Sequence, residues 1–224
     1  MARSSGKQPV VIAIDGPSAA GKGTLAHRLA DHLGFAVLDT GLLYRAVAKR
    51  LLDRGDTPEN QAAARRAAEA VAVAELSDPT LRGEGMAEAA SRVSAIPAVR
   101  EALLDLQRRF AENPLDSNGN PLPGAVLDGR DIGTVVCPQA TVKLFITASA
   151  EARARRRHKE LLDRGGASIY ARVLQDMERR DARDSGRAVA PTKPAPDAVV
   201  IDTTTLDADG ALAAALAVIR ARLG

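Results

Sequence analysis

The chain has 224 residues, of which 46% are hydrophobic and 26% charged, and its formal net charge is +3. This composition excludes an intrinsically disordered chain and allows one α/β domain with insertions. The positive charge favours an anionic partner, but an aromatic fraction of 2% leaves few rings for stacking against single-stranded nucleic acid. A small phosphorylated ligand is therefore preferred over nucleic acid.

The cysteine content and the short apolar runs indicate the compartment. Cys137 is the only cysteine, so an intrachain disulfide is excluded and a reducing environment is favoured. The apolar run at residues 10–14 is too short for the core of a signal peptide, and the alanine-rich run at 211–219 is too short to span a bilayer. We therefore expect a cytoplasmic protein that does not act at a membrane.

Short apolar runs alternate with helical patterns along the chain, which is typical of βαβ units and a parallel sheet. Strands are predicted at residues 10–14, 35–38, 125–127, 142–146 and 198–201, and a last helix at 208–223. Several strands end next to an aspartate, and ligands of open parallel sheets bind beyond the carboxyl ends of the strands. These aspartates are Asp15, Asp39, Asp128 and Asp202.

Two longer segments interrupt this strand pattern. Residues 53–110, which we call the first insertion, have a largely helical pattern broken at DRGDTPE, SDPTLRGEG and IPAV. Residues 152–196, the second insertion, end near the charged run ERRDARDSGRAVAP at 178–191. Taken by itself, such a run is typical of a solvated helix end.

The segment GPSAAGKGT follows the first predicted strand and precedes a helical pattern. It has the G-x-x-x-x-G-K spacing and the strand–loop–helix context of a phosphate-binding loop, which disfavours a chance glycine-rich turn. Glycines let backbone N–H groups turn toward an anion, the helix start adds its positive dipole end, and Lys22 reaches the β- and γ-phosphates. The candidate ATP-binding residues here are Gly16, Pro17, Ser18, Ala19, Ala20, Gly21, Lys22, Gly23 and Thr24.

Four further segments follow the phosphate-binding loop in a specific order. They are LDTGLLYRAVA (38–48), AASRVSAIPAVREALLDLQRRF (89–110), LDGRDIGTVV (127–136) and RDARDSGRAVAP (180–191). With them, the chain resembles the cytidylate kinase (CMP kinase) family of nucleoside monophosphate kinases almost from end to end. The resemblance implies a P-loop fold with a five-stranded parallel sheet flanked by helices, built as a single domain over residues 1–224.

The resemblance also implies how the domain is divided and what it does. The core comprises residues 8–52, 111–151 and 197–224, the first insertion binds the phosphate acceptor, and the second insertion is a lid. The implied reaction is the ATP-dependent phosphorylation of CMP and dCMP by a monomer, with Mg²⁺ as cofactor. A kinase for UMP or another small acceptor stays open as an alternative, as does, from another class, a P-loop ATPase or nucleic-acid-binding regulator.

The metal site is left open by the sequence. A hydroxyl residue usually follows the lysine of the loop and ligates Mg²⁺, but this chain has Gly23 there and Thr24 one place later. The Gly-Thr variant resembles nucleoside monophosphate kinases, which implies that phosphates and water hold the ion. Thr24 and Asp128 are the candidate protein ligands.

Matching positions of the family imply the acceptor site. Arg45 and Arg130 are implied to bind the acceptor phosphate, Asp184 the ribose, and Ser91, Arg100 and Asp131 the base. The full candidate CMP-binding set is Thr40, Tyr44, Arg45, Ser91, Arg100, Arg130, Asp131, Asp184 and Arg187. The candidate catalytic residues, which would neutralise the phosphates, are Lys22, Arg130, Arg180 and Arg187.

Chemistry supports the base assignment, although local alternatives exist. Cytosine has an N4 amino donor that a carboxylate such as Asp131 can accept, whereas uracil has a carbonyl there. Alternatively, Asp131 is a helix N-cap and Tyr44 a core aromatic residue.

The second insertion supplies further candidates. Arg153 and Arg157 lie four residues apart and are candidates for ATP, as in similar kinases, or else form a solvated face paired with Glu151 and Glu160. In the charged run, Arg179 and Asp181 are expected to face solvent. Arg183 is open between the donor phosphates and a local ion pair.

This chain departs from the family at two places in the first insertion. Glu88 stands where the family has an asparagine, which puts a side-chain contact from that position in question. Residues 75–86 are too few for the small β-rich insert of longer members. We therefore expect the first insertion to be mostly helical.

Overall fold

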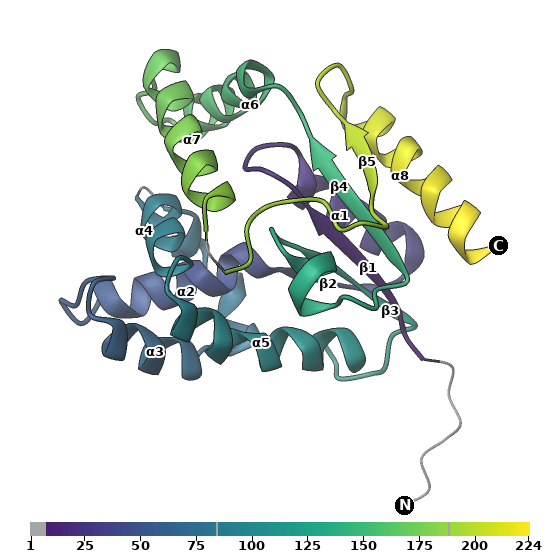
Figure 1. Cartoon of the computed structure of the whole chain (residues 1–224), viewed down its shortest axis with the longest axis horizontal. Coiled ribbons are helices and arrows are strands. Elements are labelled where there is room, and N and C mark those ends of the chain that lie inside the picture. The colour runs from purple at the N-terminus through teal and green to yellow at the C-terminus, as the bar shows by residue number, and fades with distance from the viewer. Residues whose placement is uncertain (1–7, 84, 188) are drawn as a thin grey trace, which may run out of the picture.

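The computed structural model describes residues 8–83, 85–187 and 189–224. Positions 1–7, 84 and 188 lie outside the described residues. The first seven belong to the implied domain, position 84 to the break SDPTLRGEG and position 188 to the charged run. The described chain forms a five-stranded parallel sheet with the order β2-β3-β1-β4-β5 (Figure 1). Each strand lies within one residue of its predicted ends. They are β1 (Val10–Asp15), β2 (Ala36–Asp39), β3 (Gly124–Asp128), β4 (Val142–Thr147) and β5 (Val199–Asp202).

The register of the sheet brings three predicted aspartates to one edge. Asp39 of β2 lies beside Asp128 of β3, and Asp128 lies beside Ile14 of β1, which precedes Asp15. Strand β1 is the middle strand, where chain connections leave toward both sides of the sheet, and ligands of such sheets bind at this point. The phosphate-binding loop follows β1 directly.

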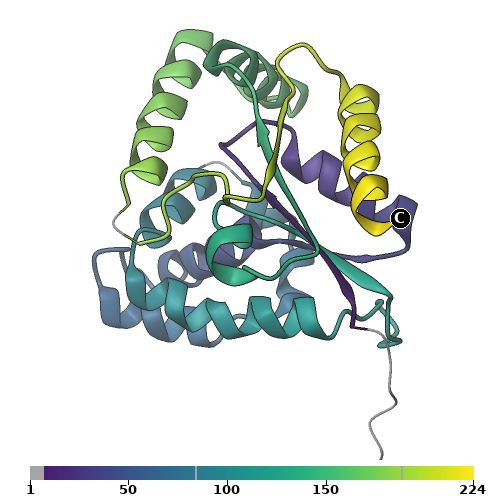
Figure 2. The ribbon, with the colours of Figure 1, turned by 45° about the vertical axis from the view of Figure 1, so that its right-hand side comes forward.

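Helices cover both faces of the sheet. Helices α1 (Lys22–Leu33) and α8 (Ala208–Leu223) lie together on one face, as Figure 2 shows, over a core that includes Ile12, Leu144 and Ile146. Helices α2 (Thr40–Leu52) and α5 (Pro97–Glu112) pack on the other face around Leu43, Val47 and Leu103. The predicted last helix, 208–223, is confirmed.

The first insertion is helical, as predicted, with no strand among its described residues. It contains α3 (Gln61–Glu69), two short 3₁₀ helices, η1 (Val73–Ser77) and η2 (Pro79–Arg82), and α4 (Met86–Val93) before α5. The Asn60 side chain caps α3 by accepting a hydrogen bond from Ala63 N at 3.1 Å. Pro97 begins α5, at a position where a backbone N–H would have no partner within the helix. These two boundaries fall at the predicted breaks.

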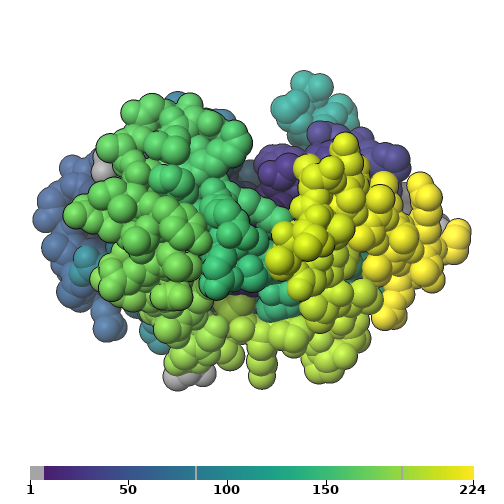
Figure 3. Space-filling model, turned by 90° about the horizontal axis from the view of Figure 1, so that it is seen from above, coloured from purple at the N-terminus to yellow at the C-terminus, as the bar shows by residue number. Residues whose placement is uncertain are grey.

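The second insertion contains α6 (Ala150–Asp163) and α7 (Tyr170–Ser185), which pack against each other. Seen from the carboxyl end of the sheet, the green surface of this insertion covers much of the molecule beside the yellow C-terminal helix (Figure 3). It reaches the first insertion, because Arg164 Nη1 donates to the Arg82 carbonyl oxygen at 3.3 Å. Across the described residues, helices fall short of the length and apolar character that crossing a membrane requires.

Candidate active site

The phosphate-binding loop has a backbone that only glycine permits at two positions. Gly16 has φ +141°, and a Cβ there would lie 2.0 Å from the Ile146 carbonyl oxygen. Gly21 has φ 90° and is the N-cap of α1. Both glycines therefore shape the turn that presents the start of α1 to an anion.

Lys22 is the first residue of α1 and is buried. Its Nζ donates to the Pro17 carbonyl oxygen at 2.8 Å and lies 3.8 Å from Asp128 Oδ1. Burial and the nearby Arg130 lower the pKa of Lys22 to about 8. Burial likewise raises the pKa of the Asp128 carboxyl to about 7, against the effect of Lys22. The two groups form one buried pair at the floor of the loop.

The three aspartates at the strand ends have different partners. Asp15 Oδ1 and Oδ2 accept from the backbone N–H groups of Ile132 and Gly133 at 2.8 and 2.7 Å. Asp39 Oδ2 lies 3.9 Å from Arg82. Asp128 is the aspartate paired with Lys22, so it is the carboxylate placed to act beside a nucleotide phosphate.

The residues beside the loop fit a metal held mainly by nucleotide phosphates and water. Asp128 supplies a buried carboxylate. Thr24, an exposed residue one place after Gly23, supplies a hydroxyl group. Within the described residues, no group of three or more histidine, cysteine, aspartate or glutamate side chains could hold a metal ion. A Mg²⁺ ion coordinated largely by oxygen atoms of its nucleotide matches such a sparse donor set.

Arg100 of α5 brings the predicted base-binding residues together. Its Nη2 donates to Asp131 Oδ2 at 2.5 Å, and its Nη1 donates to the Ser94 carbonyl oxygen at 3.2 Å. Its guanidinium lies 5.6 Å from the ring centre of Tyr44, a distance typical of a cation–π contact. Asp131 occupies the N-cap position of the one-turn π-helix η3 (Ile132–Val136), but its carboxylate makes no capping hydrogen bond. The carboxylate pairs with Arg100 instead.

Tyr44 is a core aromatic residue that also contacts a predicted site residue. It belongs to the hydrophobic core around α2, and the Arg100 guanidinium lies over its ring. Burial raises the pKa of the Tyr44 hydroxyl to about 12, so the group stays protonated and can donate a hydrogen bond.

Thr40 and Arg45 of α2 lie along the same edge. The Thr40 hydroxyl donates to the Asp128 carbonyl oxygen at 2.7 Å, which fastens α2 to β3. Arg45 Nη1 donates to the Leu81 carbonyl oxygen at 3.1 Å. Burial lowers the pKa of Arg45, and Asp39 opposes this effect. The guanidinium is still charged at neutral pH, because arginine titrates far above it.

Asp184 is the centre of an arginine cluster that the sequence motif alone does not show. This buried carboxylate of α7 lies 2.5 Å from Arg187, 3.2 Å from Arg130 and 3.9 Å from Arg180. One negative charge thus faces three positive charges. Burial lowers the pKa of Arg180 to about 10 and also lowers that of Arg187. An anion entering this cluster would relieve that excess of positive charge.

Several buried polar atoms around the site have no hydrogen-bond partner in the described chain. They are Ser18 Oγ, Arg180 Nε and Arg187 Nε, together with Asp181 Oδ1 and Thr192 Oγ1. Buried donors without partners are costly in folded proteins and call for a reason. The first three border the loop and the arginine cluster, where phosphate oxygens would supply the missing acceptors.

The two candidate arginines of α6 have different surroundings. Arg153 is buried, and its Nη1 donates to Asp181 at 2.6 Å and to the carbonyl oxygen of Ser18 in the phosphate-binding loop at 3.3 Å. It is not on a solvated face. Arg157 pairs with Glu160 at 2.8 Å, as its alternative interpretation proposed. Only Arg153 contacts the loop.

The charged run has partners that differ in part from the prediction. Asp181 does not simply face solvent, because it pairs with Arg153, and no local pattern could have revealed a partner 28 residues away. Arg179 is exposed and pairs with Asp176 in its own helix. Arg183 forms neither a local ion pair nor a contact with the loop: it pairs at 2.9 Å with Glu88 of α4, 95 residues away, and contacts Ser91. Glu88 therefore makes a side-chain contact.

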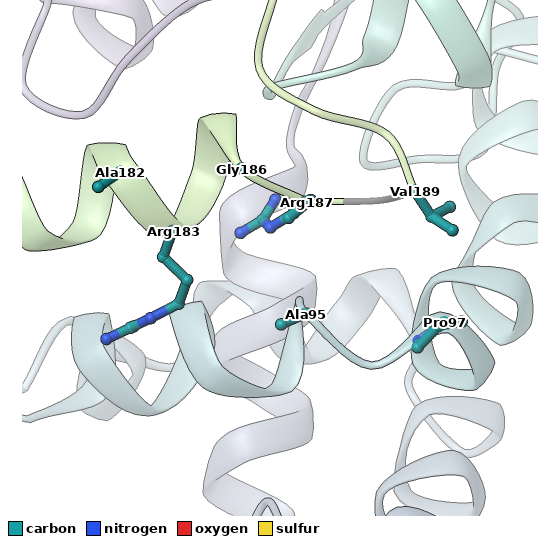
Figure 4. Close-up of a pocket in the computed structure, with 7 residues that line it drawn as sticks. All are labelled: Ala95, Pro97, Ala182, Arg183, Gly186, Arg187 and Val189. Carbon is teal, nitrogen blue, oxygen red and sulfur yellow. The ribbon is translucent and has the colours of Figure 1, made fainter.

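Two pockets flank this arrangement. One, of about 340 Å³, lies between the end of α7 and the turn after α4, and Figure 4 shows Arg183 and Arg187 at its rim. The other, of about 500 Å³, includes Thr134, Lys143 and Lys193. Neither of these two pockets is lined by the phosphate-binding loop.

Comparison with known proteins shows the family of the chain. The family model described as cytidylate kinase matches residues 12–221. A cytidylate kinase of Methylobacterium sp. (strain 4-46) is 61% identical over 95% of this chain and 98% of its own length. One of Paramagnetospirillum magneticum is 59% identical over 93% and 97%. A shikimate kinase structure from Bacteroides thetaiotaomicron, with a TM-score of 0.51 and 14% identity, covers 94% of this chain and 98% of its own and shares the fold alone.

Proposed function

Because the chain belongs to the cytidylate kinase family, we propose that it transfers the γ-phosphoryl group of ATP to CMP and dCMP. The observation that carries the proposal is the Gly-Arg-Asp turn after β3. It starts beside Asp128 and Lys22 at the phosphate-binding loop, directs Arg130 to the arginine cluster and directs Asp131 to Arg100. One short turn thus connects a donor site, a transfer site and a base site.

The acceptor oxygen belongs to a phosphate, which is already largely ionised at neutral pH, so the reaction needs no catalytic base. Catalysis then depends on alignment and on neutralising charge. Lys22 binds the β- and γ-phosphates of ATP, and the Asp184 cluster holds three cations for the transferred group and the acceptor. An arginine that acts on such a transition state contributes about 10³–10⁵ in rate. The catalytic residues are Lys22, Arg130, Arg180 and Arg187.

Mg²⁺ is the proposed cofactor, with Asp128 and Thr24 as the protein groups beside it. When bound, the ion would neutralise charge on the phosphate oxygens and make the γ-phosphorus a better electrophile for the acceptor oxygen. The Asp128 carboxyl is buried beside Lys22, and a nearby divalent cation would stabilise its ionised form.

The acceptor lies between the first insertion and the Gly-Arg-Asp turn. Asp131 accepts from the cytosine N4 amino group, while Arg100 and Ser91 bind the same base edge and Tyr44 borders it. Arg45 and Arg130 bind the acceptor phosphate, Thr40 positions α2 beside it, and Asp184 binds the ribose when the arginines turn to the phosphates. Uracil would place a carbonyl oxygen against the Asp131 carboxylate, and such a mismatch costs about 1–3 kcal/mol.

The second insertion acts as a lid over ATP. Arg153 connects it to the loop through the Ser18 carbonyl oxygen, and Arg157 is the second ATP-side arginine once its pair with Glu160 opens. Closing the lid excludes water, so the γ-phosphoryl group of ATP is transferred to the acceptor rather than to water, and ADP is released. The enzyme is proposed to act as a cytoplasmic monomer on nucleotides, without nucleic acid or a membrane.

The experiment measures ADP release with CMP, dCMP, UMP and AMP as acceptors, with and without Mg²⁺. We expect CMP and dCMP to give the highest kcat/KM, and EDTA to abolish turnover. Equal activity with UMP or AMP would contradict the CMP assignment. Equal ADP release without any acceptor would instead indicate an ATPase.

A further inference from the structure

Arg183 joins the two insertions next to the base site. It lies in α7, and Figure 4 shows its side chain extending toward α4 of the first insertion. Its Nη1 donates to Ser91 Oγ at 2.8 Å, and its Nη2 donates to Glu88 Oε1 at 2.9 Å. Glu88 and Ser91 are three residues apart on α4 and share one face of that helix. One guanidinium thus contacts a carboxylate and a buried serine together.

The two serines at this end of α4 differ in how their hydroxyl protons are used. Ser94 Oγ accepts from Arg187 at 2.7 Å and donates to the Ser91 carbonyl oxygen at 2.9 Å. Ser91 is 2% exposed and accepts from Arg183, but within residues 8–83, 85–187 and 189–224 no acceptor pairs with its own O–H. The proton of Ser91 is therefore available to a ligand.

A guanidinium carries donors only, so it cannot accept a hydrogen bond from serine. With Arg183 bound to a lone pair of Ser91 Oγ, the Ser91 O–H must point elsewhere and act as a donor. We propose that Arg183 is a specificity-determining positioning residue, which fixes Ser91 as a hydrogen-bond donor toward the unprotonated N3 edge of the pyrimidine.

The consequence for the base follows from hydrogen-bond polarity and rests on the proposed function. Cytosine offers acceptors at N3 and O2 beside its N4 donor, which matches donors from Ser91 and Arg100 and an acceptor from Asp131. Uracil carries a proton on N3, which would face the Ser91 donor. A serine without Arg183 could rotate and accept from that proton, because a hydroxyl can both donate and accept. Arg183 occupies one of the two lone pairs of Ser91 Oγ and so restricts this freedom.

Glu88 holds the other side of the guanidinium. Its side chain is 58% exposed and that of Arg183 is 33% exposed, and exposed ion pairs contribute little. The contact with Ser91 therefore carries the effect on the base, and Glu88 only limits the directions that Arg183 can take. Glu88→Gln should shift specificity in the same direction as loss of Arg183, but only about twofold.

The experiment compares kcat and KM for CMP and UMP in Arg183→Met, Arg183→Lys and a matched control, Arg179→Met. Arg179 is an exposed arginine of the same helix whose ion pair stays within α7. For Arg183→Met we expect the preference for CMP over UMP to fall about tenfold, mainly because KM for CMP rises. A tenfold change corresponds to about 1.4 kcal/mol. Arg183→Lys keeps a hydrogen-bond donor and should retain part of the preference for CMP. Arg179→Met should have the same preference as the wild type.

A double-mutant cycle with Ser91→Ala tests whether Arg183 acts through Ser91. If it does, Arg183→Met lowers the CMP preference in the wild type but not in the Ser91→Ala background. Equal losses of kcat for CMP and UMP, with the preference intact, would overturn the inference and leave Arg183 a lid contact. Additive losses would overturn it too. The proposed function fails separately, if the wild-type enzyme itself does not prefer CMP.

Discussion

The phosphate-binding loop and the Asp184 cluster both concern phosphate, yet they are built in different ways. The loop comes from nine consecutive residues, and its shape lies in the backbone of Gly16 and Gly21. The cluster comes from β3 and α7, and its shape lies in side chains that meet around Asp184.

Their charges are opposite in sign. At the loop, Lys22 interacts with three carboxylates, those of Asp15, Asp39 and Asp128, and with one other cation, Arg130. In the cluster, Asp184 is a single anion among three arginines. The acidic side suits a nucleotide that brings a divalent cation, and the basic side suits the bare phosphate of an acceptor. The difference teaches that the two sites differ in charge as well as in shape, and we propose that this separates the two substrates.

The strongest test of the loop is Lys22→Met. We expect kcat to fall about 10³-fold, because a cation at the transferred phosphate is lost from a preorganised site. The fold should persist, since Asp128 can take up a proton when its partner is removed. Steady-state kinetics and a thermal unfolding curve measure the two quantities. Near wild-type turnover by a folded variant would remove Lys22 from the mechanism.

The corresponding test of the cluster is Asp184→Asn. Three arginines would then repel one another without a carboxylate, so the free energy of unfolding should fall by about 2 kcal/mol and kcat/KM for CMP by about 10²-fold. Inorganic sulfate should raise the melting temperature of the variant more than that of the wild type, because an anion replaces the lost charge. A sulfate effect of the same size in both proteins would mean that the cluster does not bind anions.

A smaller effect is expected at the base. Asp131→Ala should raise KM for CMP about tenfold and narrow the preference for CMP over UMP, with kcat changed less. The Arg100 guanidinium loses its partner but stays beside Tyr44, so the pocket should remain formed. Discrimination equal to that of the wild type would show that Asp131 does not read the base.

The smallest effect concerns pH. Burial raises the pKa of the Asp15 carboxyl to about 6, although two backbone N–H groups lower it. Between about pH 4 and pH 6 the folded protein therefore keeps a proton on Asp15 that the unfolded chain releases. Because the unfolded chain binds fewer protons there, the free energy of unfolding falls as the pH rises through this range. We expect about 1–2 kcal/mol of decline in the free energy of unfolding between pH 4.5 and 6.5. In Asp15→Asn, denaturant titrations should show a flatter dependence, and an unchanged slope would contradict the assignment.

Much of the fold and of the site could be predicted where the information was local. The five strands follow from short apolar runs, and the loop follows from glycine spacing between a strand and a helix. Asp184 and its neighbours Arg180 and Arg187 could be named from the charged run only through the family resemblance. The pairing of Asp184 with Arg130, 54 residues away, and that of Asp181 with Arg153 could not be predicted, because side-chain pairs between distant elements leave no pattern in a single sequence.

By itself, the sequence determined the parallel sheet, the helical insertions and the phosphate-binding loop, because apolar periodicity and glycine positions act over a few residues. Only the tertiary structure decided which charges meet: Asp128 with Lys22, Asp184 with three arginines, and Arg183 with Ser91. Those contacts depend on how α7 packs over α4 and over the turn after β3, and burial there changes the energy of every charge involved.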